Sequence, residues 1–151
     1  MKQAKKTKPE HIWSLLCSTS VVDKDTNNVS VFNLVEQLNV NIDLTKIKNN
    51  KDSKIGIPVN FQLINRFAVK ENKNFQLRIE MISPDNESSV LIEKDIEIAK
   101  GITSMRVRNM IGVLPLKGSG TYHFHVNVRA DKNEDFSTAA IVPLGVTLNF
   151  Q

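Results

Sequence analysis

The stretch Gly118-Ser-Gly-Thr-Tyr-His-Phe-His-Val-Asn-Val128 decides the fold class of this chain. Two glycines provide a turn, and the residues from Tyr122 to Val128 then alternate between apolar and polar. An apolar residue at every second position is typical of a β-strand with one face in a core and the other in water. We therefore predict a half-buried strand here, with His123 and His125 on its outward face.

The same alternation recurs in both directions from this strand. Apolar residues occupy alternate positions over most of residues 13–21, 59–69, 75–81 and 90–98, and apolar-rich segments follow at 102–116 and 137–150. Turn-forming residues separate these segments at Asp23–Asn28, Ser83–Asn86 and Asp131–Asp135. Short strands at this spacing predict an all-β fold, a mostly antiparallel β-sandwich of about eight strands.

Two segments carry local signals of another kind. Residues 31–38 fit helical spacing whereas residues 38–44 alternate, so we expect a strand start, one helical turn and then extended chain. Pro143 interrupts the last apolar segment. Because proline cannot donate a hydrogen bond to a ladder, the last strand should lie at an edge or change partners there.

Length and composition are those of one soluble globular domain. The chain has 151 residues, of which 40% are hydrophobic, enough to bury a sizeable core. No apolar run approaches the ~20 residues that a membrane-spanning helix needs. Cys17 is the one cysteine, so no intrachain disulfide can form, and we predict a cytoplasmic protein in which this thiol is a buried, unreactive side chain.

The positive charge of the chain is concentrated at its N-terminus. The formal net charge is +4, and without Lys2, Lys5, Lys6 and Lys8 the chain would carry 16 basic and 16 acidic side chains. We expect residues 1–9 to form a flexible basic arm and residues 10–151 to form a single β-sandwich domain. The arm could bind nucleic acid or anionic lipid, but a solvated arm without a partner is the better interpretation.

Several motifs together resemble two kinds of known protein. Gly120-Thr-Tyr122 at the start of a late strand resembles the tyrosine corner of immunoglobulin-like and C2-like sandwiches. Phe124 stands where antibody domains carry their second cysteine, which excludes that class. Cys17, the Asp23–Asn28 turn, the Val29–Asn33 segment and the Pro84–Asn86 turn are similar to those of uncharacterised single-domain bacterial proteins. The resemblance implies a β-sandwich with no known activity.

Two sets of residues are candidate metal ligands. His123 and His125 project from one face of a strand and could bind a metal if a neighbouring strand supplied a third ligand. Asp23 and Asp25, with Asn27, have the spacing of the first oxygen ligands of a calcium loop. In a C2-like site, acids of other turns would join them, namely Asp85 and Glu87, or Asp131, Glu134 and Asp135. Exposed histidines and ordinary turn chemistry explain both sets without an ion and are the better interpretation, so we expect no metal and no other cofactor.

Basic residues outside the arm are the remaining candidates for a charged binding patch: the loop Lys46–Lys54 and the side chains of Arg66, Lys70, Lys73, Arg78, Arg106 and Arg108. Base stacking would need exposed aromatic rings between them, and only Phe67 and Phe136 depart from the core pattern. We find no nucleophile, metal-protease or phosphate-loop motif, so we predict a protein that is not an enzyme.

These observations predict a protein-interaction or assembly module, a subunit or accessory of a larger bacterial complex that associates with a protein partner or with itself. A sheet edge, such as that of the strand interrupted by Pro143, is one place for such an association. The alternative is a C2-like module that binds calcium and anionic lipid at its loops, or a metal at the face of His123 and His125.

Overall fold

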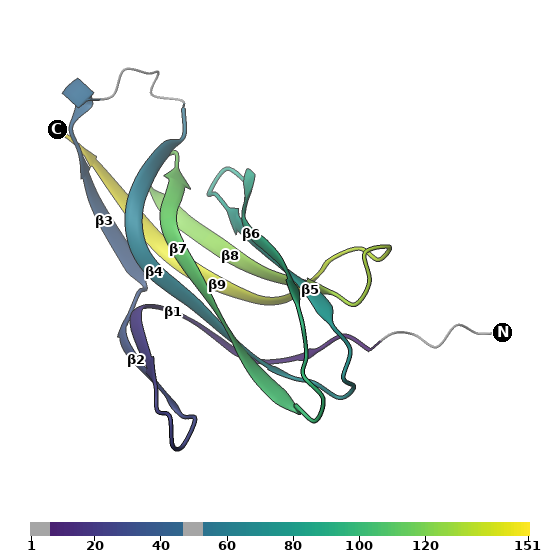
Figure 1. The fold of residues 1–151 in the computed structure, drawn as a ribbon. Helices are drawn as coiled ribbons and strands as arrows, with labels where there is room; N and C mark the ends of the chain where they lie inside the picture. The colour runs from purple at the N-terminus through teal and green to yellow at the C-terminus, as the bar shows by residue number, and fades with distance from the viewer. Residues whose placement is uncertain (1–6, 47–52) are drawn as a thin grey trace.

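The computed structural model describes residues 7–46 and 53–151, and within them it forms nine β-strands and one short 3-10 helix (Figure 1). None of the described residues belongs to a helix long and apolar enough to cross a membrane. The elements are β1 (Glu10–Val22), β2 (Val29–Leu34), β3 (Gln37–Ile42), η1 (Leu44–Lys46), β4 (Ile55–Ala68), β5 (Phe75–Ile82), β6 (Ser88–Ile96), β7 (Ser104–Leu116), β8 (Gly120–Arg129) and β9 (Ser137–Phe150).

One layer is a four-stranded antiparallel sheet with the order β2-β1-β4-β7. Strand β1 pairs with β4 only as far as Cys17, and from there to Val22 its remaining partner is β2. The β1–β2 hairpin therefore extends beyond the part of the sheet where β1 and β4 pair, as Figure 1 shows.

The other layer is a five-stranded sheet with the order β3-β9-β8-β5-β6. All its pairs are antiparallel except β3 with β9, which are parallel. Strand β8 pairs with β9 from Ser137 onward, whereas β3 joins β9 only from Gly145. Pro143 thus lies in the half of β9 that β3 does not reach, and the strand gains a second partner just after it. The expectation of an edge or a change of partner at this proline is confirmed.

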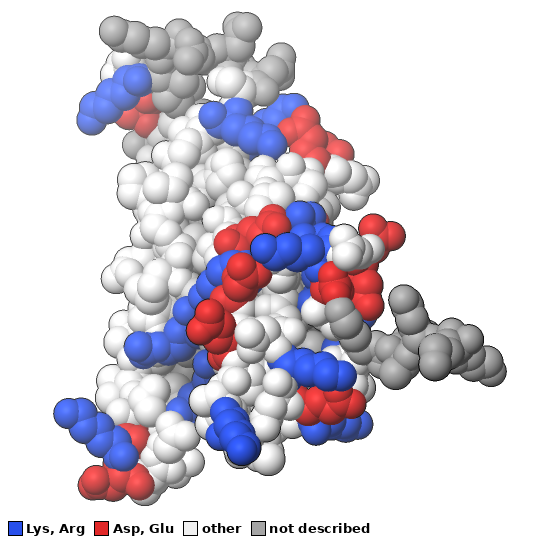
Figure 2. All heavy atoms as spheres, turned by 45° about the vertical axis from the view of Figure 1, so that its right-hand side comes forward, with Lys and Arg blue, Asp and Glu red and all other residues white. Residues whose placement is uncertain are grey.

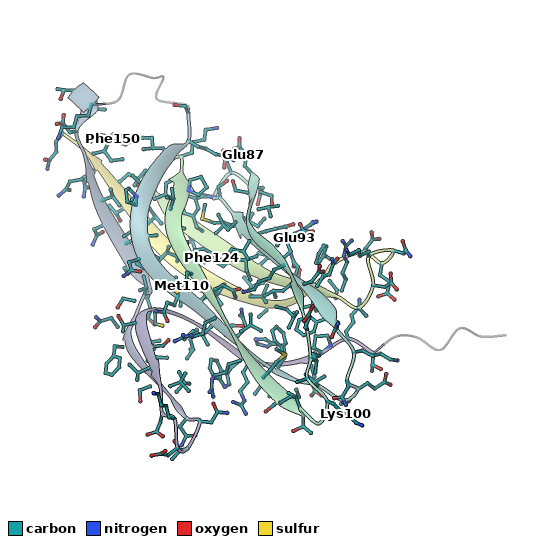
Figure 3. All side chains as sticks on the ribbon, viewed as in Figure 1. Glu87, Glu93, Lys100, Met110, Phe124 and Phe150 are labelled. Atoms are coloured by element: carbon teal, nitrogen blue, oxygen red, sulfur yellow. The ribbon has the colours of Figure 1, made fainter. Side chains whose placement is uncertain are left out.

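The predicted fold class is confirmed, because the two mostly antiparallel sheets form an all-β sandwich, with nine strands rather than eight. Tyr122, Phe124 and Val126 of β8 are fully buried in the core, opposite residues of the four-stranded sheet such as Leu63 and Phe67. Figure 3 shows Phe124 among the side chains between the sheets. Burying such side chains stabilises the fold by about 1.5–3 kcal/mol each.

The additional strand is β3, which lies in residues 31–44, where the sequence fits helical spacing in one part and strand alternation in the other. The predicted helical turn within residues 31–38 is wrong: β2 ends at Leu34, β3 begins at Gln37, and the one helical turn follows later, as η1. The chain crosses between the sheets at Val35 and Glu36. Val35 donates its amide to the carbonyl of Leu16 in one sheet (2.8 Å), and Glu36 accepts the amide of Gly145 from the other (2.9 Å). Of the apolar residues at three- and four-residue spacing here, Val35 and Leu38 pack against the core while Leu34 is exposed, and no helix forms.

Candidate interaction surface

The Asp23–Asn28 turn uses its first carboxylate to hold the β1–β2 hairpin together. Oδ1 of Asp23 accepts the amides of Asp25 and Thr26, both at 2.8 Å, and Asn27 takes a left-handed backbone with φ of 57°. The backbone donors Thr26 and Asp25 lower the pKa of Asp23. The calcium-like spacing in the sequence is therefore accounted for by turn formation.

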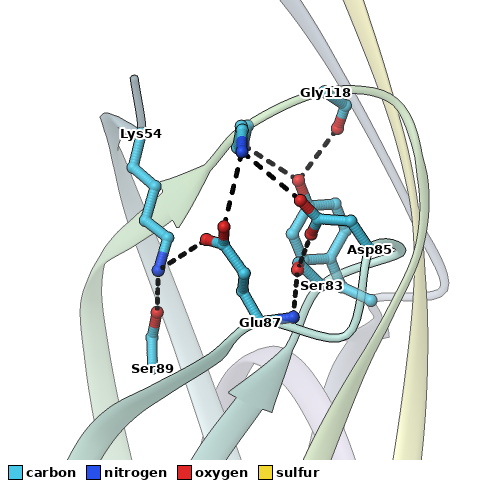
Figure 4. A network of polar contacts seen from close by, with 8 residues as sticks. Lys54, Ser83, Asp85, Glu87, Ser89 and Gly118 are labelled. Carbon is cyan, nitrogen blue, oxygen red and sulfur yellow. Dashed lines mark hydrogen bonds and ion pairs between the residues drawn. The ribbon is translucent and has the colours of Figure 1, made fainter. Parts of the chain in front are cut away.

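The acids of the β5–β6 turn are also engaged, in the network of Figure 4. Lys117 Nζ lies 3.4 Å from a carboxylate oxygen of Asp85 and 3.4 Å from one of Glu87, and Lys54 Nζ lies 3.3 Å from the other oxygen of Glu87. A hydrogen bond from Ser83 lowers the pKa of Asp85, and Lys117 contributes to the same effect. In Figure 1 this turn, the β1–β2 turn and the β8–β9 turn lie at different corners of the molecule, so the predicted acids do not converge on one site.

His123 and His125 both lie on the outer face of β8, as predicted from their spacing. His123 is paired with Ile82 and Pro143, and His125 with Glu80 and Ile141. In the part of the chain that the structure describes, no three His, Cys, Asp or Glu side chains come close enough together to hold a metal ion.

Cys17 is fully buried, as predicted, and its burial raises the pKa of the thiol. It pairs with Leu34 on one side and with Gln62 on the other, and Gln62 pairs in turn with Met110. Strand alternation directs this row away from the central core, because its neighbours Leu16 and Leu63 face inward. The row therefore crosses the outer face of the four-stranded sheet.

This outer face carries exposed apolar side chains that do not pack in the core. Met110 is 58% exposed, and Leu34 and Val113 are each 55% exposed. Val113 pairs with the exposed Pro58 on β4. We call Leu34, Pro58, Met110 and Val113 the apolar patch (Met110 is labelled in Figure 3). Figure 2 shows, on the face turned toward the viewer, a broad uncharged area beside a band where acidic and basic side chains alternate.

Three of the predicted basic residues meet on the same outer face. Arg66 pairs directly with Arg106, and Arg108 follows two residues along β7. The other three predicted residues form ion pairs of their own: Lys70 with Glu10, Lys73 with Glu71 and Arg78 with Glu93. Residues 47–52, most of the predicted basic loop, and Lys2, Lys5 and Lys6 of the arm lie outside the described residues. The sequence could not show which arginines converge, because that depends on the register of β4 with β7.

The two aromatic rings that depart from the core pattern have different environments. Phe67 is fully buried and packs edge-on against Phe75, so the expectation that it is exposed is wrong. Phe136 is half-buried on the outer face of the five-stranded sheet, between the guanidinium groups of Arg78 (4.1 Å) and Arg129 (4.3 Å). This ring contributes cation–π contacts to its own fold.

Neither a protein-family model nor a curated protein sequence matches the chain.

Proposed function

We propose that this chain is a non-catalytic protein-interaction module of a larger bacterial complex, acting in the cytoplasm, and that it docks on a partner through the apolar patch. The supporting observation is that Leu34, Met110 and Val113, each more than half exposed, lie on one face of one sheet. Exposed apolar side chains that gather on one face mark protein interaction sites more often than ordinary surface.

The outer face of the five-stranded sheet is a less suitable docking surface. Arg78 bonds Glu93 and Glu80 there, and Gln76 donates to Asp95. Arg78 with Glu93 and Gln76 with Asp95 are cross-strand pairs, so this face is occupied by polar side chains that bond one another. Its exposed apolar residues, Val90 and Ile141, are separated in one row of the register by the acidic Glu80 and by His125. In the corresponding row of the other sheet, the residues between Leu34 and Met110 are Cys17 and Gln62, which are not charged.

The hydroxyl of Tyr122 supports the comparison with immunoglobulin-like or C2-like modules. It donates to the carbonyl of Gly118 (2.9 Å) and accepts the amide of Lys117 (3.0 Å), a few residues upstream (Figure 4). This is the bonding pattern of a tyrosine corner. Such sandwiches commonly serve as interaction modules, and that likeness supports the proposal only by analogy.

The test uses two pairs of substitutions at matched exposure. The variant Met110→Ser/Val113→Ser removes apolar surface from the proposed interface, and Val90→Ser/Ile141→Ser removes the same kind of surface from the other sheet. Affinity capture from the native cell, with light scattering to detect self-association, should show loss of the partner or of the oligomer for the first pair alone. Equal retention by both variants would contradict docking at the apolar patch.

A further inference from the structure

A hollow of about 320 Å³ lies between the β1–β2 hairpin and strands β4 and β7. Arg66, Arg106 and Arg108 line it together with Val22, Asn27, Ser104 and Met105. Each guanidinium is positioned by one neutral acceptor. Arg66 Nη2 donates to Ser104 Oγ (2.9 Å), Arg106 Nη2 donates to Asn27 Oδ1 (2.7 Å), and Arg108 Nη1 donates to Ser20 Oγ (3.3 Å). We propose that this hollow binds the phosphate group of a small phosphorylated molecule.

The three positive charges have no acid at ion-pair distance among the residues that the structure describes. None of the three arginines forms an ion pair there, whereas Arg78 on the other sheet bonds Glu93 at 2.9 Å. Arg66 and Arg106 are also direct cross-strand partners, and like charges at such positions destabilise a sheet. An arrangement that costs local stability is expected where a ligand supplies the missing charge.

The chemistry of the hollow favours phosphate over a single carboxylate. A guanidinium has five N–H donors in a fixed fork, so the one bond that each arginine makes within the protein leaves donors for a ligand. A phosphate monoester offers three acceptor oxygens and ≈ −1.5 to −2 charge at neutral pH. A carboxylate offers two oxygens and a single negative charge. That is fewer acceptors and less charge than three guanidinium groups can pair with.

The lining also indicates a small ligand. The volume is near the lower end of the ~300–1,000 Å³ of small-molecule sites. None of the residues that line the hollow is aromatic; Trp13, the cross-strand partner of Arg66, is not among them. Stacking of a nucleic-acid base, the usual means of binding single strands, therefore has no platform inside it. Polar contacts to the phosphate group then supply most of the affinity.

Binding is tested by calorimetry with inorganic phosphate and with glycerol phosphate, at a constant ionic strength of about 0.15 M. We expect saturable binding of both, with sulfate weaker and acetate weaker still. Arg106→Gln and Arg108→Gln should each lower the affinity at least about tenfold, the loss of one charge-assisted bond. The matched control is Lys70→Gln, which removes the same charge from an exposed ion pair and should leave the affinity unchanged.

Two results would overturn the proposal: no saturable phosphate binding by the full chain, or an equal loss of affinity in the Lys70→Gln control. Tighter binding to vesicles that contain phosphatidic acid, or to a single-stranded oligonucleotide, than to glycerol phosphate would overturn the small-ligand assignment. Met110→Ser/Val113→Ser should keep phosphate binding, so this test and that of the apolar patch can fail independently.

Discussion

Tyr122 shows how one polar atom can stabilise the turn that precedes a core strand. Its side chain is buried, and its hydroxyl bonds two backbone groups of the β7–β8 turn. Tyr122→Phe keeps the packing and leaves the amide of Lys117 and the carbonyl of Gly118 without this partner. We expect the free energy of unfolding to fall by about 1–3 kcal/mol. Urea denaturation measures the loss, and an unchanged midpoint would show that water replaces the hydroxyl at no cost.

The same residue predicts a loss of stability at alkaline pH. Burial raises the pKa of Tyr122 above its ordinary value of 10.0. The folded state therefore holds this proton more tightly than the unfolded state, so the contribution is complete below pH 10 and is lost as pH rises through the folded pKa. Because Tyr122 is the one tyrosine of the chain, phenolate absorbance follows it alone. A normal tyrosine titration in the folded protein would contradict this prediction.

Gly120, at the start of β8, lies where the β7–β8 turn packs against Pro84 of the β5–β6 turn. Its φ is +142°, and a Cβ atom there would lie 2.6 Å from Cγ of Pro84. Gly120→Ala should therefore destabilise the protein by about 1–3 kcal/mol. Gly112 in β7 is the matched control, because a Cβ there has no neighbour within 4 Å. Gly112→Ala should be neutral or stabilising by up to about 1 kcal/mol. Thermal unfolding of the two variants measures the difference, and equal effects would contradict the role given to Pro84.

The sequence pattern predicts individual strands better than it predicts how the strands pair and which of their faces meets the core. Strand β8 was predictable because alternation is a local property of residues 122–128. In β1, by contrast, Leu16 reaches the central core, while the apolar series that contains Cys17 faces the other side of the sheet. Which face of a strand meets the core depends on its partners in the sheet. The convergence of Arg66 with Arg106 depends in the same way on pairing across 40 residues of chain, which no local pattern shows.

For the whole molecule, the topology places distant parts of the sequence side by side. Strand β1 pairs with β4, and β3 pairs in parallel with β9 at the other end of the described chain. The crossing at Val35 and Glu36 is hydrogen-bonded to both sheets, so the first strands become fully bonded only when β9 is in place. Sandwiches with such non-local pairing fold in milliseconds to seconds.

The net positive charge of the chain comes from the four lysines among its first eight residues. This uneven distribution predicts how the protein binds anionic surfaces. Replacing Lys2, Lys5, Lys6 and Lys8 by Gln leaves 16 basic and 16 acidic side chains. We expect this variant to elute from a cation exchanger at much lower salt than the wild type. The melting temperature should change little, because the bond from Lys8 to Ser137 is solvent-exposed and β1 begins only at Glu10.

The matched control replaces four lysines that are spread over the domain, Lys24, Lys46, Lys100 and Lys132, and so reaches the same net charge. It should elute at higher salt than the arm variant, because clustered charges bind an anionic surface more strongly than the same charges dispersed among acids. Identical elution of the two variants would mean that net charge alone sets the interaction. The arginine hollow retains its three charges in both variants, so both should bind inorganic phosphate as the wild type does.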